Sequence, residues 1–240
     1  KEIIKFKKSG KEILLVSSGA LALGKKSLKI EKNNLKVPEK QAASSVGQVL
    51  LINAWKKAFL KYKKQCGQIL LTHLDAEIRS SAINARNTIE SLIKLDTIPI
   101  INENDSVATQ ELRYGDNDQL AARVAQITSS DLLILLSDVD GLYTSNPKKN
   151  NNAKLIKYIK KITKTIEKYS ENTSSSIAVG GMHTKIKAAK IALSSGCNML
   201  ITRGNKETPI NSILKKGKFS LFLTTISPKT ARKKWISSQI

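Results

Sequence analysis

The chain has 240 residues, two cysteines, a 40% hydrophobic content and a formal net charge of +22 at pH 7. This length allows one large domain or two small ones with a buried core. No apolar run approaches the length of a membrane span, and no signal-peptide pattern is present, so we expect no membrane partner. Cys66 and Cys197 lack the spacing of a metal site or a redox motif, which predicts reduced thiols in a cytoplasmic protein.

The positive charge alone suggests a polyanionic partner. However, only six of the 41 basic residues are arginine, at positions 79, 86, 113, 123, 203 and 232. Proteins that read phosphates and bases favour arginine for its bidentate geometry, and no basic-aromatic motif accompanies the charge. We therefore expect no specific nucleic-acid partner.

The first half of the chain alternates between strand-like and helix-like segments, which is typical of a layered α/β domain with a largely parallel sheet. We expect helices over 2–9, after residue 20, over 38–65 and over 81–95, and strands over 13–16, 68–71 and 98–101. The long helix is expected to bury an apolar face made of Val46, Val49, Leu50, Ile52, Ala54, Phe59 and Leu60. The helix over 81–95 is expected to turn Ile83, Ile89, Leu92 and Ile93 inward.

The second half continues the alternation. We expect a helix opening at 119–122, a buried strand over 132–136, a solvated loop over 146–152 and an edge strand over 155–159. Helices over 163–169 and 183–194 follow, and the last strands cover 198–202 and 219–224. The chain begins inside a helix, whereas α/β domains normally begin with a strand, so we expect a further segment before residue 1.

Four polar loops each follow a predicted strand, over 17–20, 102–118, 137–141 and 202–205. Loops after parallel strands converge at one edge of the sheet, where the ligands of open α/β sheets bind. The 102–118 connection carries two clusters of carboxylates and amides, Asn102–Asp105 and Gly115–Asp118. One cluster alone would indicate turn chemistry. Two in one connection, with a third after the next strand, favour a polar substrate or a phosphoryl-transfer centre.

The segment Gly180–Lys185 has the chemistry of a phosphate cradle. Its paired glycines let backbone N–H groups approach an anion, and Lys185 can reach a transferring phosphoryl group. It is not a P-loop, and a flexible turn with an N-cap explains the motif equally well. Ser137–Asp138 is suited either to capping the next element or to holding a nucleotide, and the sequence does not separate these alternatives.

The two histidines, His73 and His183, have no cysteine or carboxylate at ligand spacing, so we expect no zinc site. His73 is predicted to be a surface or loop residue. Trp55 and Trp235 are predicted to be packing residues. The chain has no serine-nucleophile elbow and no reactive-cysteine context.

Taken together, seven motifs resemble the glutamate 5-kinase family, whose members have the amino acid kinase fold. They are Val16–Ala20, Gln41–Gln48, Asn84–Thr88, Pro99–Asp105, Gly115–Asp118, Ser137–Thr144 and Gly180–Lys185. The resemblance runs in order through essentially all 240 residues. It implies a three-layer αβα sandwich with a mainly parallel central sheet, formed by a single domain over residues 1–240.

The resemblance also implies ATP-dependent phosphorylation of the γ-carboxylate of L-glutamate to L-glutamyl 5-phosphate, the first step of proline biosynthesis. Ser18, Asp105 and Asn117 would bind glutamate. Lys185 would neutralise charge on the transferring phosphoryl group, and Asp118 would orient the lysines around it. ATP would be bound by Ser137, Asp138, Val179, Gly180, Gly181, Met182, His183, Thr184 and Lys185.

No residue of the chain is expected to act as a direct metal ligand, because Mg²⁺ would be held mainly through the nucleotide phosphates. The γ-carboxylate is already a nucleophile at pH 7, so catalysis reduces to in-line positioning and charge stabilisation, without a general base. Members of the family tend to form homo-oligomers, which we also expect here.

Three departures from the family pattern stand out. The family begins with a strand and a Lys-x-Gly-(Ser/Thr) loop, which this sequence lacks. Ala178–Val179 replaces a Gly-Thr pair, and His183 replaces a small polar residue. Many members also continue into a C-terminal RNA-binding-like domain, whereas this sequence stops soon after Trp235, so we expect a piece of a larger protein.

Two alternatives remain at this point. One is another enzyme of the same fold, with acetylglutamate, aspartate, carbamate or a nucleoside monophosphate as the acceptor. The other is a non-catalytic binding protein that keeps the fold.

Overall fold

The computed structural model describes residues 1–32, 34–107, 117–172, 181–205, 207–215, 217–227 and 230–231. The chain divides into two compact units. The N-terminal unit comprises Lys1 and Ile3–Asn117, and the C-terminal unit comprises Glu2 and Asp118–Ile240.

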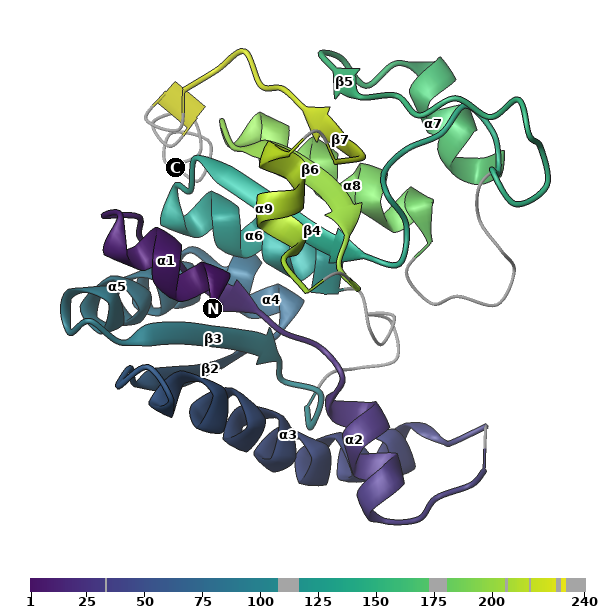
Figure 1. Cartoon of the computed structure of the whole chain (residues 1–240). Coiled ribbons are helices and arrows are strands. Elements are labelled where there is room, and N and C mark those ends of the chain that lie inside the picture. The colour runs from purple at the N-terminus through teal and green to yellow at the C-terminus, as the bar shows by residue number, and fades with distance from the viewer. Residues whose placement is uncertain are drawn as a thin grey trace. The chain divides into compact units, whose positions relative to one another are not determined.

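The N-terminal unit contains a three-stranded parallel sheet in the order β1-β3-β2 (Figure 1). Its elements are α1 (Glu2–Lys8, whose first residue belongs to the other unit), β1 (Leu15–Val16), α2 (Ala20–Ser27), α3 (Val37–Leu60), β2 (Cys66–Leu71), α4 (His73–Glu77), α5 (Arg79–Lys94) and β3 (Ile98–Glu103). The central strand β3 is buried along its whole length. This matches the continuous apolar run Ile98–Ile101, because a strand covered on both faces has no polar side.

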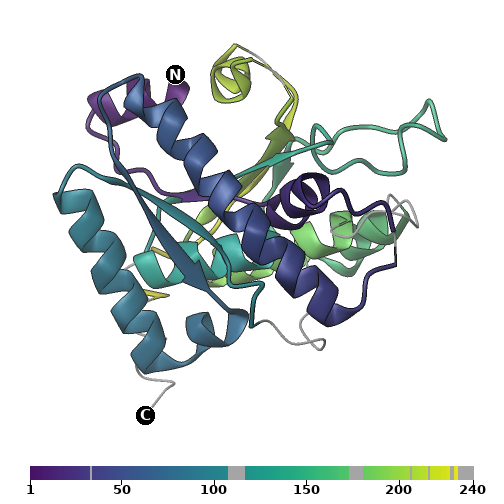
Figure 2. The same ribbon diagram turned by 90° about the horizontal axis from the view of Figure 1, so that it is seen from below.

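Helices cover both faces of this sheet, with α3 on one face and α5 on the other (Figure 2). Ile98 and Ile100 point to one face and form a buried cluster with Ile4 of α1 and Phe59 of α3. On the opposite face, a Cβ added at Gly67 would lie 2.8 Å from the side chain of Leu92 in α5. The alternation of side chains along the strands therefore gives the unit three layers.

The predicted apolar face of α3 is confirmed only at Phe59, which is buried, and at Ile52, which packs against the same cluster. Val46, Val49, Leu50, Ala54 and Leu60 are exposed. The residues that α3 buries are Ala43, Ser44, Gly47, Leu51 and Phe59. Two of these buried residues, Ala43 and Gly47, are small because α3 packs closely on α2. A Cβ at Gly47 would lie 1.8 Å from the carbonyl oxygen of Ala20, and a Cβ at Gly24 would lie 1.7 Å from that of Ala43.

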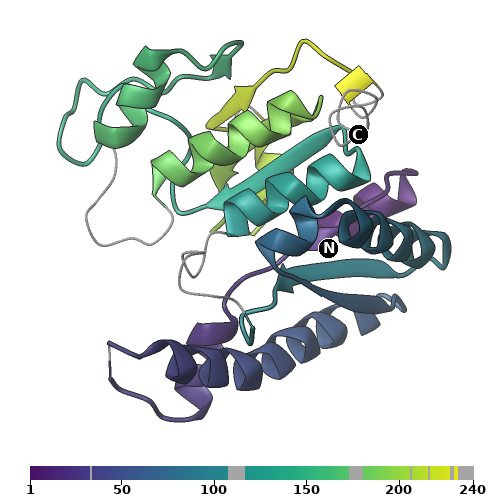
Figure 3. The same ribbon diagram turned by 180° about the vertical axis from the view of Figure 1, so that it is seen from behind.

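The C-terminal unit contains a four-stranded sheet in the order β4-β6-β7-β5, in which only β6 and β7 pair antiparallel. Its elements are α6 (Asn117–Thr128, whose first residue belongs to the other unit), β4 (Leu132–Ser137), β5 (Tyr158–Ile159), α7 (Lys164–Asn172), α8 (Met182–Ser194), β6 (Asn198–Arg203), α9 (Pro209–Leu214) and β7 (Phe219–Phe222). Helices α6 and α8 lie side by side on one face of the sheet (Figure 3), and α9 lies on the other.

The predicted α/β class and the mainly parallel strand pairing are confirmed, but some details of burial and length are wrong. Strand β4 is at the end of its sheet, so Leu132 and Leu136 are 47% and 51% exposed instead of buried. Ile83 of α5 is also exposed. The short helices α4 and α9 were not predicted, and His73 is the first residue of α4. None of the helices in the described part of the chain is both long and apolar enough to cross a membrane.

Candidate active site

In the N-terminal unit, a chain of side-chain amides joins the loop after β1 to β3, to α3 and to the first residue of α6. Asn117 Nδ2 donates to the main-chain oxygen of Ser17 at 3.0 Å and to Asn102 Oδ1 at 3.2 Å. Asn102 Nδ2 in turn donates to Gln48 Oε1 of α3 at 2.6 Å. Within the described residues, the buried Oδ1 of Asn117 accepts no hydrogen bond. A buried acceptor without a donor is costly, so this oxygen is suited to a ligand that brings a donor.

Ser17 and Ser18 have different surroundings although they are adjacent. Ser17 is buried: its N–H donates to Ile101 at 2.8 Å, and its Oγ accepts a hydrogen bond from Trp55 Nε1 at 2.9 Å. Ser18 is exposed at the end of β1, just before α2. Ser17 therefore holds the loop, whereas the hydroxyl of Ser18 is accessible to a ligand.

Asp105 lies two residues beyond the end of β3 and is partly buried. Burial raises the pKa of its carboxyl, and the Ser44 hydroxyl beside it partly offsets the rise. A carboxylate that is partly removed from water gains most from a cation brought by a ligand. The N-terminal unit thus brings together Asn117 and the end of β1. It also places the partly buried Asp105 carboxyl, whose pKa is raised, just beyond the end of β3.

In the C-terminal unit, Lys185 of α8 and Asp118 of α6 form an ion pair. Lys185 Nζ donates to Asp118 Oδ2 at 2.8 Å, and the side chains are 9% and 24% exposed, respectively. The Thr184 hydroxyl lies 3.3 Å from the same oxygen and donates to the Gly181 carbonyl at 2.8 Å. The pair holds a lysine ammonium in a fixed position in the second turn of α8.

The start of α8 is suited to binding an anion. Gly181 is its N-cap residue, in extended conformation, and no side chain of the described residues caps the helix there. Helix N-termini carry partial positive charge and N–H groups without intrahelical partners. Met182 is buried and His183 is exposed, so Met182 could reach a ligand only through its main chain. The predicted residues Val179 and Gly180 lie outside the described residues.

Ser137 and Asp138 lie at the end of β4, beside the end of β6. Ser137 pairs in register with Arg203, and the Ser137 carbonyl accepts a hydrogen bond from the Gly204 N–H at 2.7 Å. Ser137 Oγ donates to Asp138 Oδ1 at 3.0 Å. Sequence analysis placed Arg203 in the polar loop over 202–205 without a partner, and its side chain donates to Asp140 Oδ1 at 3.0 Å and Oδ2 at 3.4 Å. The polar loops after β4 and β6 therefore meet, as predicted for parallel strands.

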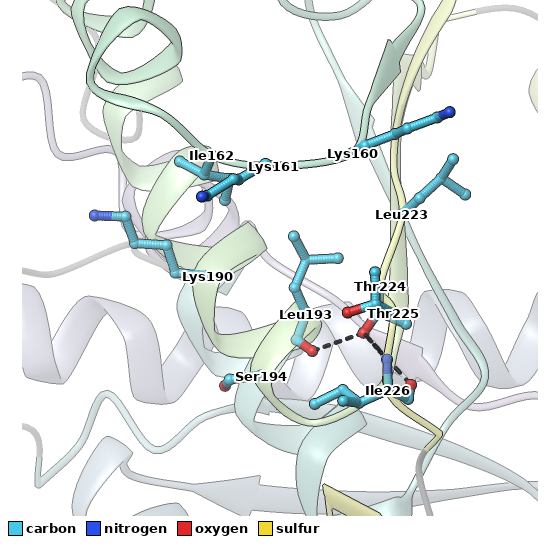
Figure 4. A pocket seen from close by; sticks show the side chains of 10 residues that line it. All are labelled: Lys160, Lys161, Ile162, Lys190, Leu193, Ser194, Leu223, Thr224, Thr225 and Ile226. Carbon is cyan, nitrogen blue, oxygen red and sulfur yellow. Dashed lines mark hydrogen bonds between the residues drawn. The ribbon is translucent and has the colours of Figure 1, made fainter.

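A cavity of about 320 Å³ lies at the other end of α8 (Figure 4). Lys161, Lys190, Leu193 and Thr224 are among its lining residues, and none of the predicted site residues lines it. The Thr224 hydroxyl donates to the Leu193 carbonyl at 2.9 Å. The cavity is thus separate from the start of α8. No group of three or more His, Cys, Asp or Glu side chains in the described part of the chain could hold a metal ion.

Solved structures identify the fold. The UMP kinase from Ureaplasma parvum aligns with a TM-score of 0.54 at 17% sequence identity, covering 83% of this chain and 75% of that one. The isopentenyl phosphate kinase of T. acidophilum aligns with a TM-score of 0.53 at 17% identity, covering 89% of this chain and 86% of that one. The chain therefore has the fold of these kinases.

The amino acid kinase family matches residues 1–203, so the chain belongs to this family. Curated relatives include the glutamate 5-kinase of Pelagibacter ubique (strain HTCC1062), 51% identical over 240 residues, which are all of this chain and 65% of the relative. The glutamate 5-kinase of Nitrobacter winogradskyi is 49% identical over 231 residues, which are 96% of this chain and 61% of the relative. The chain spans a little less than two thirds of the length of these relatives.

Proposed function

We propose that the chain carries the kinase region of a glutamate 5-kinase, which transfers the γ-phosphoryl group of ATP to the γ-carboxylate of L-glutamate in proline biosynthesis. The observation that carries this proposal is the identity of about one half to curated glutamate 5-kinases along the whole chain. The polar side chains of each unit support it independently.

The N-terminal unit supplies groups that suit a free amino acid. The unpartnered Oδ1 of Asn117 and the Asp105 carboxylate are acceptors, as an α-ammonium group requires. The accessible hydroxyl of Ser18 is suited to donating a hydrogen bond to a carboxylate. We assign these three residues to glutamate binding, with Gln48 and Asn102 holding Asn117 in its orientation.

The C-terminal unit supplies groups that suit a nucleotide triphosphate. The start of α8 and Lys185 offer N–H groups and positive charge to phosphate oxygens, and Ser137–Asp138 offers a hydroxyl and a carboxylate to the nucleoside. These residues fit ATP, with Val179–Lys185 around the phosphates. Mg²⁺ bound to the phosphates would neutralise part of their charge. The chain's own residues would hold it only through the nucleotide.

In the proposed reaction, an oxygen of the γ-carboxylate attacks the γ-phosphorus as the bond to the β,γ-bridging oxygen breaks, and ADP carries away the electron pair. No proton has to be removed, because the attacking carboxylate is ionised at pH 7. Lys185 stabilises negative charge on the transferring group, and Asp118 fixes the position of its ammonium. Positioning and charge stabilisation of this kind are the main catalytic contributions in phosphoryl transfer.

The test is ADP release by the full-length protein with L-glutamate, acetylglutamate, aspartate, carbamate or a nucleoside monophosphate as the acceptor. We expect turnover with L-glutamate alone and a loss of about 10²–10³-fold in kcat for Asp118→Asn. Turnover with a different acceptor would identify another enzyme of the family. A folded protein that binds ATP but turns over none of the acceptors would identify a binding protein and overturn the proposal.

Three further points belong to the same proposal. Residues 1–240 are one amino acid kinase domain, a proposal that the family match over residues 1–203 supports. The protein acts in the cytoplasm, where glutamate and ATP are available. It acts as a homo-oligomer, which size-exclusion chromatography with light scattering would test.

A further inference from the structure

The loop after β4, over residues 138–141, is held at both ends by hydrogen bonds to the main chain of the residues that flank it. At its start, the Gly204 N–H donates to the Ser137 carbonyl, and a Cβ at Gly204 would lie 2.9 Å from that of Leu136. At its end, the Leu142 N–H donates to Ser220 Oγ at 2.8 Å, and Ser220 Oγ donates to the Ile156 carbonyl at 2.6 Å. The path of the loop therefore does not depend on its side chains alone.

Within this loop, Asp140 binds the Arg203 guanidinium through both carboxylate oxygens. Asp140 Oδ2 also accepts a hydrogen bond from the Tyr143 hydroxyl at 3.4 Å. The Asp140 side chain is 17% exposed and that of Arg203 is 37% exposed. This hydrogen bonding to Asp140 raises the pKa of Arg203, and the charge of Asp138 adds to the rise. Asp138 also lies next to Arg203 in the strand pairing, because it directly follows Ser137, which pairs in register with Arg203.

Asp138 and Asp140 are consequently competitors for one cation. In the structure, Asp140 holds Arg203, and the Asp138 carboxylate accepts only the Ser137 hydroxyl among the hydrogen bonds of the described residues. A carboxylate that is already paired with arginine would be a poorer acceptor for a ligand, because the pair must first be broken. The position of Arg203 therefore decides whether Asp138 is available.

We propose that Asp140 is a positioning residue for the nucleotide: by holding Arg203, it keeps the guanidinium away from Asp138 and leaves that carboxylate to accept a hydrogen bond from a hydroxyl or amino group of ATP. The inference rests on the proposed function, because it takes Ser137–Asp138 as nucleotide-binding residues. It adds a pair of residues, Asp140 and Arg203, that act on ATP only through Asp138.

The test is calorimetric titration of the full-length protein with ATP in the absence of an acceptor. We expect Asp140→Asn to bind ATP about tenfold more weakly, which is the effect of losing one hydrogen bond to a charged group. Arg203→Gln should bind ATP within about twofold of wild type. The double variant, which carries both Asp140→Asn and Arg203→Gln, should also bind ATP within about twofold of wild type, because no cation then competes for Asp138. A merely structural role of the pair would give a double variant at least as weak as Asp140→Asn.

Asp96→Asn is the control, since Asp96 pairs with Lys7 and Lys64 in the N-terminal unit and should leave ATP affinity unchanged. Thermal unfolding of each variant confirms that it folds. Wild-type affinity in Asp140→Asn, or weak binding in the double variant, would overturn the inference while leaving the kinase intact. Failure of the proposed function looks different: the wild type would then not bind ATP, or Asp138→Asn would bind as wild type does.

Discussion

Lys185 and Asp118 are joined across 2.8 Å, but they are shielded from water to different extents: the lysine side chain is 9% exposed and the aspartate 24%. Removing either partner takes the opposite charge of this pair away from the other, and the cost rises with burial. The two residues should therefore respond unequally to substitution, although they belong to one ion pair.

We expect Asp118→Asn to lower the free energy of unfolding by about 1–3 kcal/mol, because it leaves a buried ammonium beside a neutral amide. Lys185→Met should cost less stability, because the aspartate that remains is more accessible to water. Both variants should lose kcat by about 10²–10³-fold. Urea unfolding and ADP-release assays measure the two effects. A larger loss of stability for Lys185→Met would contradict this account of the pair.

Asp105→Asn should stabilise the protein at pH 7 and weaken glutamate binding. Burial raises the pKa of Asp105 in the folded protein above the pKa of 3.8 that the carboxyl has in the unfolded chain. The contribution of Asp105 to stability is therefore fully present below pH 3.8, and it is lost as the pH rises through the pKa of the folded state. At pH 7 the ionised side chain therefore costs stability that the amide does not. We expect a higher urea midpoint for the variant at pH 7.5, a smaller difference at pH 4.5, and glutamate binding weakened by about tenfold or more.

Asp96→Asn is the control with the opposite sign. Hydrogen bonds from Lys64 and Lys7 lower the pKa of Asp96 to about 2. Its contribution to stability is present above the unfolded value of 3.8 and is lost as pH falls toward 2. Asp96→Asn should therefore destabilise the protein at pH 7.5, and glutamate affinity should not change. If both aspartates shifted the urea midpoint in the same direction, the electrostatic argument would be wrong.

Gly47→Ala should destabilise the contact between α2 and α3. The added methyl group would lie 1.8 Å from the Ala20 carbonyl oxygen, so the helices must separate. Overpacking of this kind costs about 1–3 kcal/mol. Ser45→Ala, on the exposed side of α3, is the control and should change the unfolding free energy little or raise it, since alanine favours helix. Equal stability of the two variants would show that the helices can part without cost.

The two cysteines should be unreactive in the folded protein, and Cys197 more so than Cys66. Burial raises the pKa of both thiols, to about 12 for Cys197, which is fully buried. Only the thiolate reacts with iodoacetamide. At pH 8 we expect slow alkylation at Cys66 and none at Cys197, with both labelled in urea. Peptide mass spectrometry locates the label, and native labelling of Cys197 ahead of Cys66 would contradict the structure.

Much of the fold follows from the sequence, because buried parallel strands are recognisable as apolar runs. Ile98–Ile101 predicted β3, and the polar residues after it marked the end of the strand. Asp118 and Lys185 were also identified from their local motifs. Their pairing and the meeting of the loops after β4 and β6 follow from the strand topology.

The contacts that were missed depend on partners far apart in the chain. Gln48 and Asn102 are 54 positions apart, and Asp140 and Arg203 are 63 apart, so only the tertiary packing of α3 on β3 and of the loop after β4 beside β6 brings them together. The buried face of α3 was mispredicted in part, for another reason. Its core side includes the small residues Ala43 and Gly47, and the larger Val49 lies outside. Hydrophobicity alone does not reveal a face selected for small size.

The close packing of Gly24 and Gly47 also has a consequence for the order of folding. The helices that it joins, α2 and α3, follow one another in the chain, whereas β1 must pair with β3 across the whole intervening segment. Short loops close at a lower entropic cost, and local contacts form early. The helix pair should therefore be present in the folding transition state. Gly47→Ala should accordingly slow refolding more than it accelerates unfolding.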